Sequence, residues 1–172
     1  MTKMTDCTGQ TKTGQQGAKL AVVVDSREQC PFPFDNPKYQ ATVQAGTLQT
    51  GDYSLAGLTD KIAVERKSLP DLVQCLGRDR ERFVRELERA QGLKFAIVCE
   101  GSLAQIAKHE YQSQLDPHAA IQSIAALTLR FGVPFFFGEG RRQAEYFTWS
   151  FLYQFQQDAV KRLKTIARAG AA

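Results

Sequence analysis

Short apolar runs recur along the chain and predict buried strands. LAVVVD (20–25) is β-branched and ends in an acid, so we expect a strand that is buried on both faces and carries Asp25 to a site at its end. The runs LKFAIVCEG (93–101) and VPFFFG (133–138) have the same character. Such runs predict a central sheet that is covered on both sides.

Helical signals lie between and after these runs. Ser68, with Asp71 three residues later, has the spacing of a helix N-cap, so we expect Lys67 to end a strand and Ser68 to start a helix. Periodic apolar positions predict further helices over 79–91, 120–131 and 141–168.

Two segments have other signatures. Residues 30–39 hold three prolines and are expected to be irregular. Residues 41–67, which end in the strand KIAVERK, are expected to form a hairpin-like region with turns or bulges at Gly46, Gly51 and Gly57. The alternation of strands and helices predicts an α/β fold, a three-layer sandwich whose mixed central sheet is flanked by helices.

Length and local composition set the domain limits. The 172 residues suffice for one domain with a single core. Residues 1–18 are rich in Thr, Gln and Gly and have almost no apolar content, so we expect a disordered N-terminal tail. We place a single domain at 19–168 and expect a frayed C-terminus at 169–172.

Overall composition excludes several classes of protein. With 43% hydrophobic and 23% charged residues, the chain is expected to be a soluble globular protein. No apolar run is long enough to span a bilayer, so we expect no membrane partner and a cytosolic location, nucleoid-associated in a bacterium or nuclear in a eukaryote. The scattered cysteines favour free thiols over structural zinc. The net charge of +4 is compatible with a polyanionic partner without demonstrating one.

Candidate chemistry is concentrated in residues 51–67. Hydrolysis of a phosphodiester needs an activated water, a Lewis acid and positive charge near the phosphate. Asp52 follows a glycine at a bend, and Glu65 and Lys67 are two apart on a predicted strand, so they share one face while Arg66 points to the other. Clustered carboxylates suit Mg²⁺. Taken alone, however, the Glu-x-Lys pair is a very weak signal and is far more often an ordinary surface ion pair across one strand face.

The spacing around this pair is more specific. The pattern G-D...E-R-K-x-x-x-D, from Gly51 to Asp71, resembles the nuclease signature of the XPF-type structure-specific endonucleases, a branch of the PD-(D/E)xK superfamily. VVDSRE (23–28) is similar to the first strand of that family. The resemblance continues through GRDRERFVRELERA and LTLRFGVPFFFGEGRRQAEYF, and so covers roughly residues 20–160.

The resemblance implies a restriction-endonuclease-like fold, dependence on Mg²⁺ with Mn²⁺ as a substitute, and cleavage of branched, flap or fork DNA near junctions of single and double strands. By analogy the catalytic residues are Asp52, Glu65 and Lys67, and the metal ligands, direct or through water, are Asp25, Glu28, Asp52 and Glu65. Arg27, Arg66 and Asp71 support the motif; for Arg66 and Asp71 a buried ion pair and a helix cap are the structural alternatives.

Some roles stay open at this point. Asp25 can instead cap a turn, and Arg27 can contact phosphate or pair with a neighbouring acid. Arginines at 78, 82, 85 and 89 predict one helical stripe, which suits either DNA phosphates or a salt-bridged surface. Of these, Arg78 and Arg82 are the better candidates for DNA contact because they are nearest the helix that follows the motif.

The C-terminal helix bears on assembly. Its aromatic residues between Tyr146 and Phe155 surround the helix almost completely, so either core packing or an interface accounts for them. Family relatives pair through this domain, which implies a homodimer or heterodimer. Relatives also commonly carry a tandem helix-hairpin-helix domain that this sequence lacks, so a partner, a longer chain or a compact nuclease are alternatives. A silent DNA-binding or scaffold subunit is the competing function.

Overall fold

A computed structural model describes residues 19–170, which form six strands and five helices. The predicted tail, residues 1–18, and the last two residues of the predicted frayed end lie outside the described part of the chain. In chain order the elements are β1 (Leu20–Asp25), β2 (Ala41–Gly46), β3 (Tyr53–Leu55), β4 (Ile62–Lys67), α1 (Leu69–Leu76), α2 (Arg80–Arg89), β5 (Lys94–Cys99), α3 (Leu103–Ala107), α4 (Pro117–Phe131), β6 (Phe135–Phe137) and α5 (Arg141–Ala169).

The strands make one mixed sheet in the order β2-β1-β3-β4-β5-β6. β3 runs antiparallel to both of its neighbours, β1 and β4, so β1 and β4 run in the same direction. Their carboxyl ends therefore lie at one edge of the sheet, and β3 begins at that same edge. This topology brings the end of β1, the bend before β3 and the end of β4 together.

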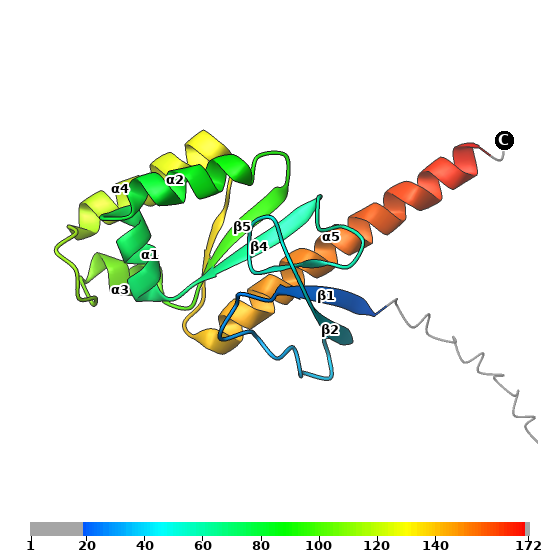
Figure 1. Cartoon of the computed structure of the whole chain (residues 1–172), viewed down its shortest axis with the longest axis horizontal. Coiled ribbons are helices and arrows are strands. Elements are labelled where there is room, and N and C mark those ends of the chain that lie inside the picture. Colours follow the sequence, from blue (N-terminus) through cyan, green and yellow to red (C-terminus); the bar gives the residue numbers. More distant parts are fainter. Residues whose placement is uncertain (1–18, 171–172) are drawn as a thin grey trace, which may run out of the picture.

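Helices cover both faces of the sheet (Figure 1). On β4, Ala63 faces the core shared with α1, α2 and α4, whereas Ile62 and Val64 face the core shared with α5. The two cores are filled by Phe83 and Leu87 of α2 on one side and by Leu152 of α5 on the other, all essentially inaccessible to water. The three-layer α/β sandwich with a mixed sheet is confirmed.

Strand pairing differs from the prediction in residues 41–67. β2 is not part of a hairpin: it pairs in parallel with β1, with Leu20 opposite Ala41, at the edge of the sheet. β3 and β4 are the antiparallel neighbours, joined by residues 56–61. Gly51 and Gly57 lie at a bend and a turn, whereas Gly46 is the last residue of β2 and pairs with Asp25. A turn signal also does not specify which strand pairs with which.

The start of α1 matches the prediction, α2 begins within one residue of its predicted start, and α4 begins earlier than expected. α1 begins directly after its N-cap, Ser68. Arg78 precedes α2, so it lies outside the helical stripe expected for it. α4 begins at Pro117, three residues before the predicted start, because the Asp116 side chain accepts the Ala119 N–H and caps the helix there.

The C-terminal helix agrees closely with the prediction at both ends. α5 begins at Arg141, as expected, and extends one residue past the predicted domain limit, to Ala169. A difference of one residue is within the ordinary variation at helix ends. Among the described helices, none has the length and apolar character needed to cross a membrane.

Candidate active site

Gly51 and Asp52 lie at a tight bend immediately before β3. Gly51 has φ +82°, and a Cβ there would approach the Ala63 Cβ to 2.9 Å and the Val64 carbonyl oxygen to 3.2 Å. Only glycine lets this bend pack so closely on β4. The Asp52 N–H donates to the Val64 carbonyl at 2.8 Å, and the Asp52 carboxylate accepts the Arg66 N–H at 2.7 Å. The acid is thereby fixed beside the strand motif.

Glu65 and Lys67 project from β4 toward α2. Lys67 Nζ lies 2.5 Å from Glu65 Oε1 and 3.7 Å from Glu86 Oε2. All three side chains are largely buried. The prediction that Glu65 and Lys67 share a face is confirmed by their contact. Glu86 belongs to α2 and is not part of the sequence motif.

A cavity of about 200 Å³ opens where these segments meet. Three acids expected from the sequence line it, Asp25, Asp52 and Glu65, together with Glu86 and Arg89 from α2. The remaining lining residues are Arg27, Gln49, Thr50 and Gly51. The tertiary structure thus brings carboxylates from β1, the bend, β4 and α2 to one polar cavity.

The acids of this cavity are not equivalent. Burial raises the pKa of Asp52 to about 6, against the opposing effect of the Arg66 N–H. Burial also raises the pKa of Glu65 well above its usual value, and the nearby Asp52 and Glu86 carboxylates add to the effect. For Lys67, burial favours the neutral amine, but Glu65 and Glu86 outweigh it and raise the pKa. Negative charge is therefore incompletely balanced around Asp52 and Glu65.

Asp25 is held differently. Its carboxylate accepts hydrogen bonds from the Arg27 side chain at 2.7 and 3.0 Å and from the Leu48 N–H at 2.7 Å. The Arg27 guanidinium, opposed by burial and assisted by the Leu48 N–H, lowers the pKa of Asp25 to about 2. Asp25 is thus an ionised carboxylate that fastens the turn after β1, and its charge is already paired with Arg27.

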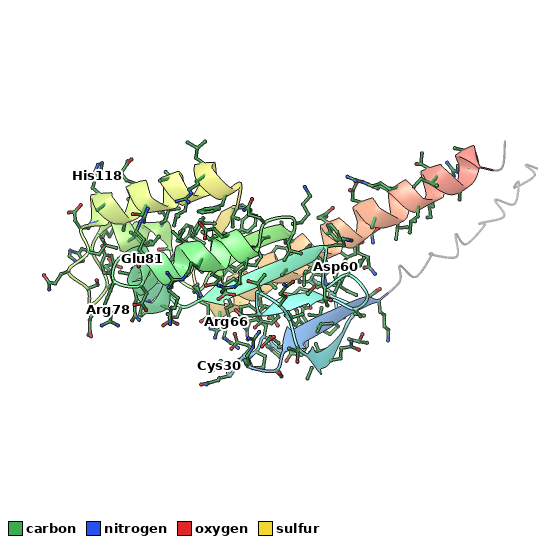
Figure 2. The ribbon with its side chains drawn as sticks, turned by 45° about the horizontal axis from the view of Figure 1, so that its top comes forward. Cys30, Asp60, Arg66, Arg78, Glu81 and His118 are labelled. Atoms are coloured by element: carbon green, nitrogen blue, oxygen red, sulfur yellow. The ribbon has the colours of Figure 1, made fainter. Side chains whose placement is uncertain are left out.

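Glu28 and Arg66 form an ion pair beside the cavity. Arg66 donates to both carboxylate oxygens of Glu28, at 2.9 and 3.1 Å, and to Glu100 at 3.1 Å. Arg141, at the start of α5, reaches the same Glu100 oxygen at 2.7 Å. Figure 2 labels Arg66, a residue of β4, near the middle of the molecule. Glu28 does not line the cavity, and its carboxylate is bound by Arg66.

Asp71 and Ser68 occupy the start of α1. Ser68 Oγ accepts the Asp71 N–H at 3.2 Å and donates to the Asp71 carboxylate at 2.6 Å. Neither residue lines the cavity. The motif aspartate is therefore part of the helix cap that Ser68 forms, at the position that the spacing predicts.

Asp52 and Glu65 are the pair that suits a hard divalent cation. Mg²⁺ is commonly held by one or two carboxylates and keeps several waters, and a cation would balance the buried negative charge at this pair. Within residues 19–170, no three acid, His or Cys side chains are already close enough together to hold a metal ion. The four expected ligands do not form one cluster, because Asp25 and Glu28 are turned to the guanidinium groups of Arg27 and Arg66.

The arginines proposed for DNA contact lie in different surroundings. Arg27 lines the cavity with its side chain 69% exposed. Arg78 and Arg82 are exposed but both pair with Asp79, at 3.7 and 3.0 Å. Arg89 reaches the cavity from the last turn of α2. Since Glu86 and Arg89 are three residues apart on one helix, their common face could have been found from the helical period.

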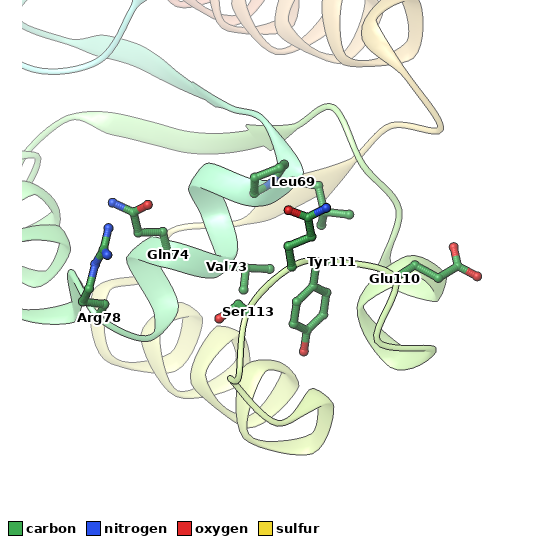
Figure 3. A pocket seen from close by; sticks show the side chains of 9 residues that line it. Leu69, Val73, Gln74, Arg78, Glu110, Tyr111 and Ser113 are labelled. Atoms are coloured by element: carbon green, nitrogen blue, oxygen red, sulfur yellow. The ribbon is translucent and has the colours of Figure 1, made fainter.

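A larger cavity of about 650 Å³ lies away from Asp52 and Glu65 (Figure 3). Leu69 and Val73 of α1 form one wall, and Tyr111 and Ser113 of the loop before α4 form the other. Glu110 is the one carboxylate among the described residues that line it, so this cavity offers no acid pair to a cation. The smaller acidic cavity is the candidate active site.

Comparisons with known proteins bear on the family and the fold. The model of the ERCC4 domain matches residues 24–149, well over half of the chain. XPF from Aeropyrum pernix has a similar structure, with a TM-score of 0.60 and 25% identity over 78% of this chain and 60% of that chain. XPF from Aeropyrum pernix in complex with DNA has a TM-score of 0.65 and 24% identity over 81% of this chain and 66% of that one.

This chain spans less than two thirds of each of those XPF chains. No curated protein sequence matches it significantly. The resemblance drawn from the Gly51–Asp71 pattern is nevertheless confirmed, because the family match includes every residue of that pattern. The chain belongs to the ERCC4 domain family.

Proposed function

We propose that this protein is a divalent-metal-dependent endonuclease that hydrolyses phosphodiester bonds in branched, flap or fork DNA. The observation that carries the proposal is the convergence of Asp52 and Glu65 on one polar cavity from two separate segments, with Lys67 held against Glu65. Those segments supply the acids and the ammonium that phosphodiester hydrolysis requires. A solved structure of XPF from Aeropyrum pernix contains DNA, which supports DNA as the class of substrate.

Each side chain has a distinct role in the proposed reaction. Asp52 and Glu65 would hold Mg²⁺ or Mn²⁺, which would supply the Lewis acid needed to activate water and to balance charge on the phosphate. Lys67, held against Glu65, places positive charge beside the reacting phosphate and orients the attacking water. Asp25 keeps the turn after β1 in place through Arg27.

DNA approach depends on the arginines that border the cavity. Arg27 and Arg89 both line it, so they are suited to bind the phosphates that flank the cleaved bond. Arg82 is already paired with Asp79 at 3.0 Å, and Arg78 lies farther from that acid. Both are better suited to weaker, sequence-independent contact with the backbone of the DNA.

Cleavage assays test the proposal. Purified protein is incubated with linear, flap, fork and four-way-junction DNA, in Mg²⁺, in Mn²⁺ and in EDTA. We expect cleavage of branched DNA with either metal and none in EDTA. Asp52→Asn and Lys67→Ala should abolish cleavage, while Glu81→Gln, an exposed substitution on α2, should not. DNA binding without cleavage under all conditions would favour a silent DNA-binding or scaffold subunit.

We also propose that the protein pairs through α5. Most of the aromatic residues of the helix are partly buried against the core, and Trp149 stacks on Tyr39 of the segment before β2 and donates its ring N–H to the Tyr39 carbonyl oxygen. The helix then runs past the sheet (Figure 1), with Leu163 and Ile166 about two thirds exposed. Sedimentation should show a dimer for the wild type and a monomer for Leu163→Glu/Ile166→Glu; a monomeric wild type contradicts the pairing.

A further inference from the structure

We propose that Glu86 of α2 is a third cation-binding carboxylate of the active-site cavity and acts on the same ion as Asp52 and Glu65. The inference rests on the proposed function, because it assumes that the cavity takes a divalent cation. It adds a residue that lies outside the strand motif and comes from a different layer of the fold. The ion would then be held between the sheet and the helix that covers it.

The first observation is the position of Glu86. Its side chain lines the cavity, and its carboxylate lies 3.7 Å from Lys67 Nζ, which is itself 2.5 Å from Glu65. Two carboxylates, one from the sheet and one from α2, thus flank a single ammonium group. The Glu86 side chain is only 17% exposed, so its charge is poorly screened by water.

The second observation is a hydroxyl group. Thr50 lines the same cavity, is only 7% exposed, and its Oγ1 has no hydrogen-bond partner among the described residues. Buried polar groups are nearly always satisfied, by protein or by ordered water. A water bound to a cation in the cavity would supply the missing partner. The hydroxyl therefore points independently to a hydrated ligand at this place.

Charge balance agrees with both observations. Arg27 neutralises Asp25, which leaves Asp52, Glu65 and Glu86 facing two cationic groups, Lys67 and Arg89. One negative charge is in excess. Lys67 already has a counter-ion in Glu65, whose contact with the ammonium is shorter than that of Glu86 by more than about 1 Å. Glu86 is therefore not needed to neutralise Lys67.

Direct titration of the full chain with Mn²⁺ alone, by calorimetry and without DNA, tests the inference. Glu86→Gln keeps the shape of the side chain and removes its charge. Glu81→Gln makes the same change at an exposed position of α2 and serves as the matched control. We expect Glu86→Gln to weaken Mn²⁺ binding by about tenfold or more, which corresponds to about 1.4 kcal/mol, and Glu81→Gln to leave it unchanged.

A second variant distinguishes direct binding of the cation by the Glu86 carboxylate from the effect of its negative charge alone. Glu86→Asp keeps the negative charge but withdraws the carboxylate by one methylene, so it should also bind Mn²⁺ about tenfold more weakly. Wild-type affinity in Glu86→Asp or in Glu86→Gln would overturn the role of Glu86. Thermal unfolding in EDTA checks that each variant is folded.

Thr50→Val provides an independent arm, because it keeps the shape and removes the hydroxyl. Weaker Mn²⁺ binding in Thr50→Val supports a hydrated ion at this place, and unchanged binding argues against it. If the wild type binds no Mn²⁺, the metal dependence under the proposed function fails together with the inference. If the wild type and Glu86→Gln both bind Mn²⁺ with the same affinity while Asp52→Asn does not bind it, only the inference about Glu86 fails.

Discussion

The main-chain N–H of Arg66 donates a 2.7 Å hydrogen bond to the carboxylate of Asp52. The Arg66 side chain, on the opposite face of β4, is held by Glu28 and Glu100. Arg66 therefore holds Asp52 in position through its main-chain N–H and holds β4 in position through its guanidinium. This arrangement explains how a motif arginine that faces away from the cavity can still determine its geometry.

The stability of the metal-free protein should depend on pH through Asp52. Because the folded pKa of about 6 exceeds the ordinary 3.8, the folded state holds this proton more tightly, and stability falls as pH rises from about 4 to 6. Asp52→Asn removes the charge. We expect Asp52→Asn to be more stable than the wild type above about pH 7 by on the order of 2 kcal/mol. Urea unfolding in EDTA at about pH 4 and about pH 7.5 measures the difference, which should be much smaller at the lower pH.

Arg141 should contribute to stability through the loop that it holds. Its guanidinium donates to the carbonyl oxygens of Cys30 and Pro31 and to Glu100, all at 2.7 Å, and lies over the Phe32 ring. Arg141→Met keeps the length but loses these bonds, at a cost of about 1–3 kcal/mol. Arg142→Met, at an exposed neighbouring position, should cost far less. Equal losses in the two variants, measured by urea unfolding, would contradict this role.

Removal of the cap on α1 should destabilise the protein modestly. Ser68 Oγ accepts the Asp71 N–H, which otherwise has no partner in the helix. Ser68→Ala should lower the free energy of unfolding by about 1 kcal/mol, whereas Ser68→Thr, which keeps the acceptor, should lower it less. The comparison is made by chemical denaturation at fixed pH. A Thr variant as unstable as the Ala variant would show that the hydroxyl is not the stabilising group.

Two arginines of α2 should differ in their effect on DNA. Arg89 lines the acidic cavity, and Arg82 is paired with Asp79 on the surface. If the proposed function holds, Arg89→Ala should reduce kcat/KM for branched DNA by about tenfold or more, and Arg82→Ala by a few-fold, since a contact nearer the reacting phosphate contributes more to the transition state. Steady-state cleavage rates at one salt concentration give both values. A larger loss of kcat/KM in Arg82→Ala than in Arg89→Ala would indicate that the DNA does not bind across the cavity.

Local patterns determined much of this fold. The apolar runs predicted β1 and β5 because β-branched and aliphatic residues without polar alternation suit strands covered on both sides. The Ser68 spacing predicted the start of α1, and the period of two placed Glu65 beside Lys67. These features depend on neighbours along the chain, so the sequence alone is sufficient to predict them.

The pairing of the strands, and the charge contacts between residues far apart in the chain, could be assigned only from the tertiary structure. The glycines of residues 46–57 indicate turns, but whether β2 joins β1 or β3 depends on packing against distant elements. Likewise, Asp25 and Glu28 have the ligand chemistry of Asp52, and only the placement of Arg27 and Arg66 decides that their charges are already paired. Glu86 and Arg89 enter the cavity because α2 packs over β4.

The sequence by itself determined the family pattern, the fold class and the three residues that converge at the end of β4. The tertiary structure alone decided around which acids negative charge is incompletely balanced, because burial and charge in a cavity depend on side chains that are far apart in the chain.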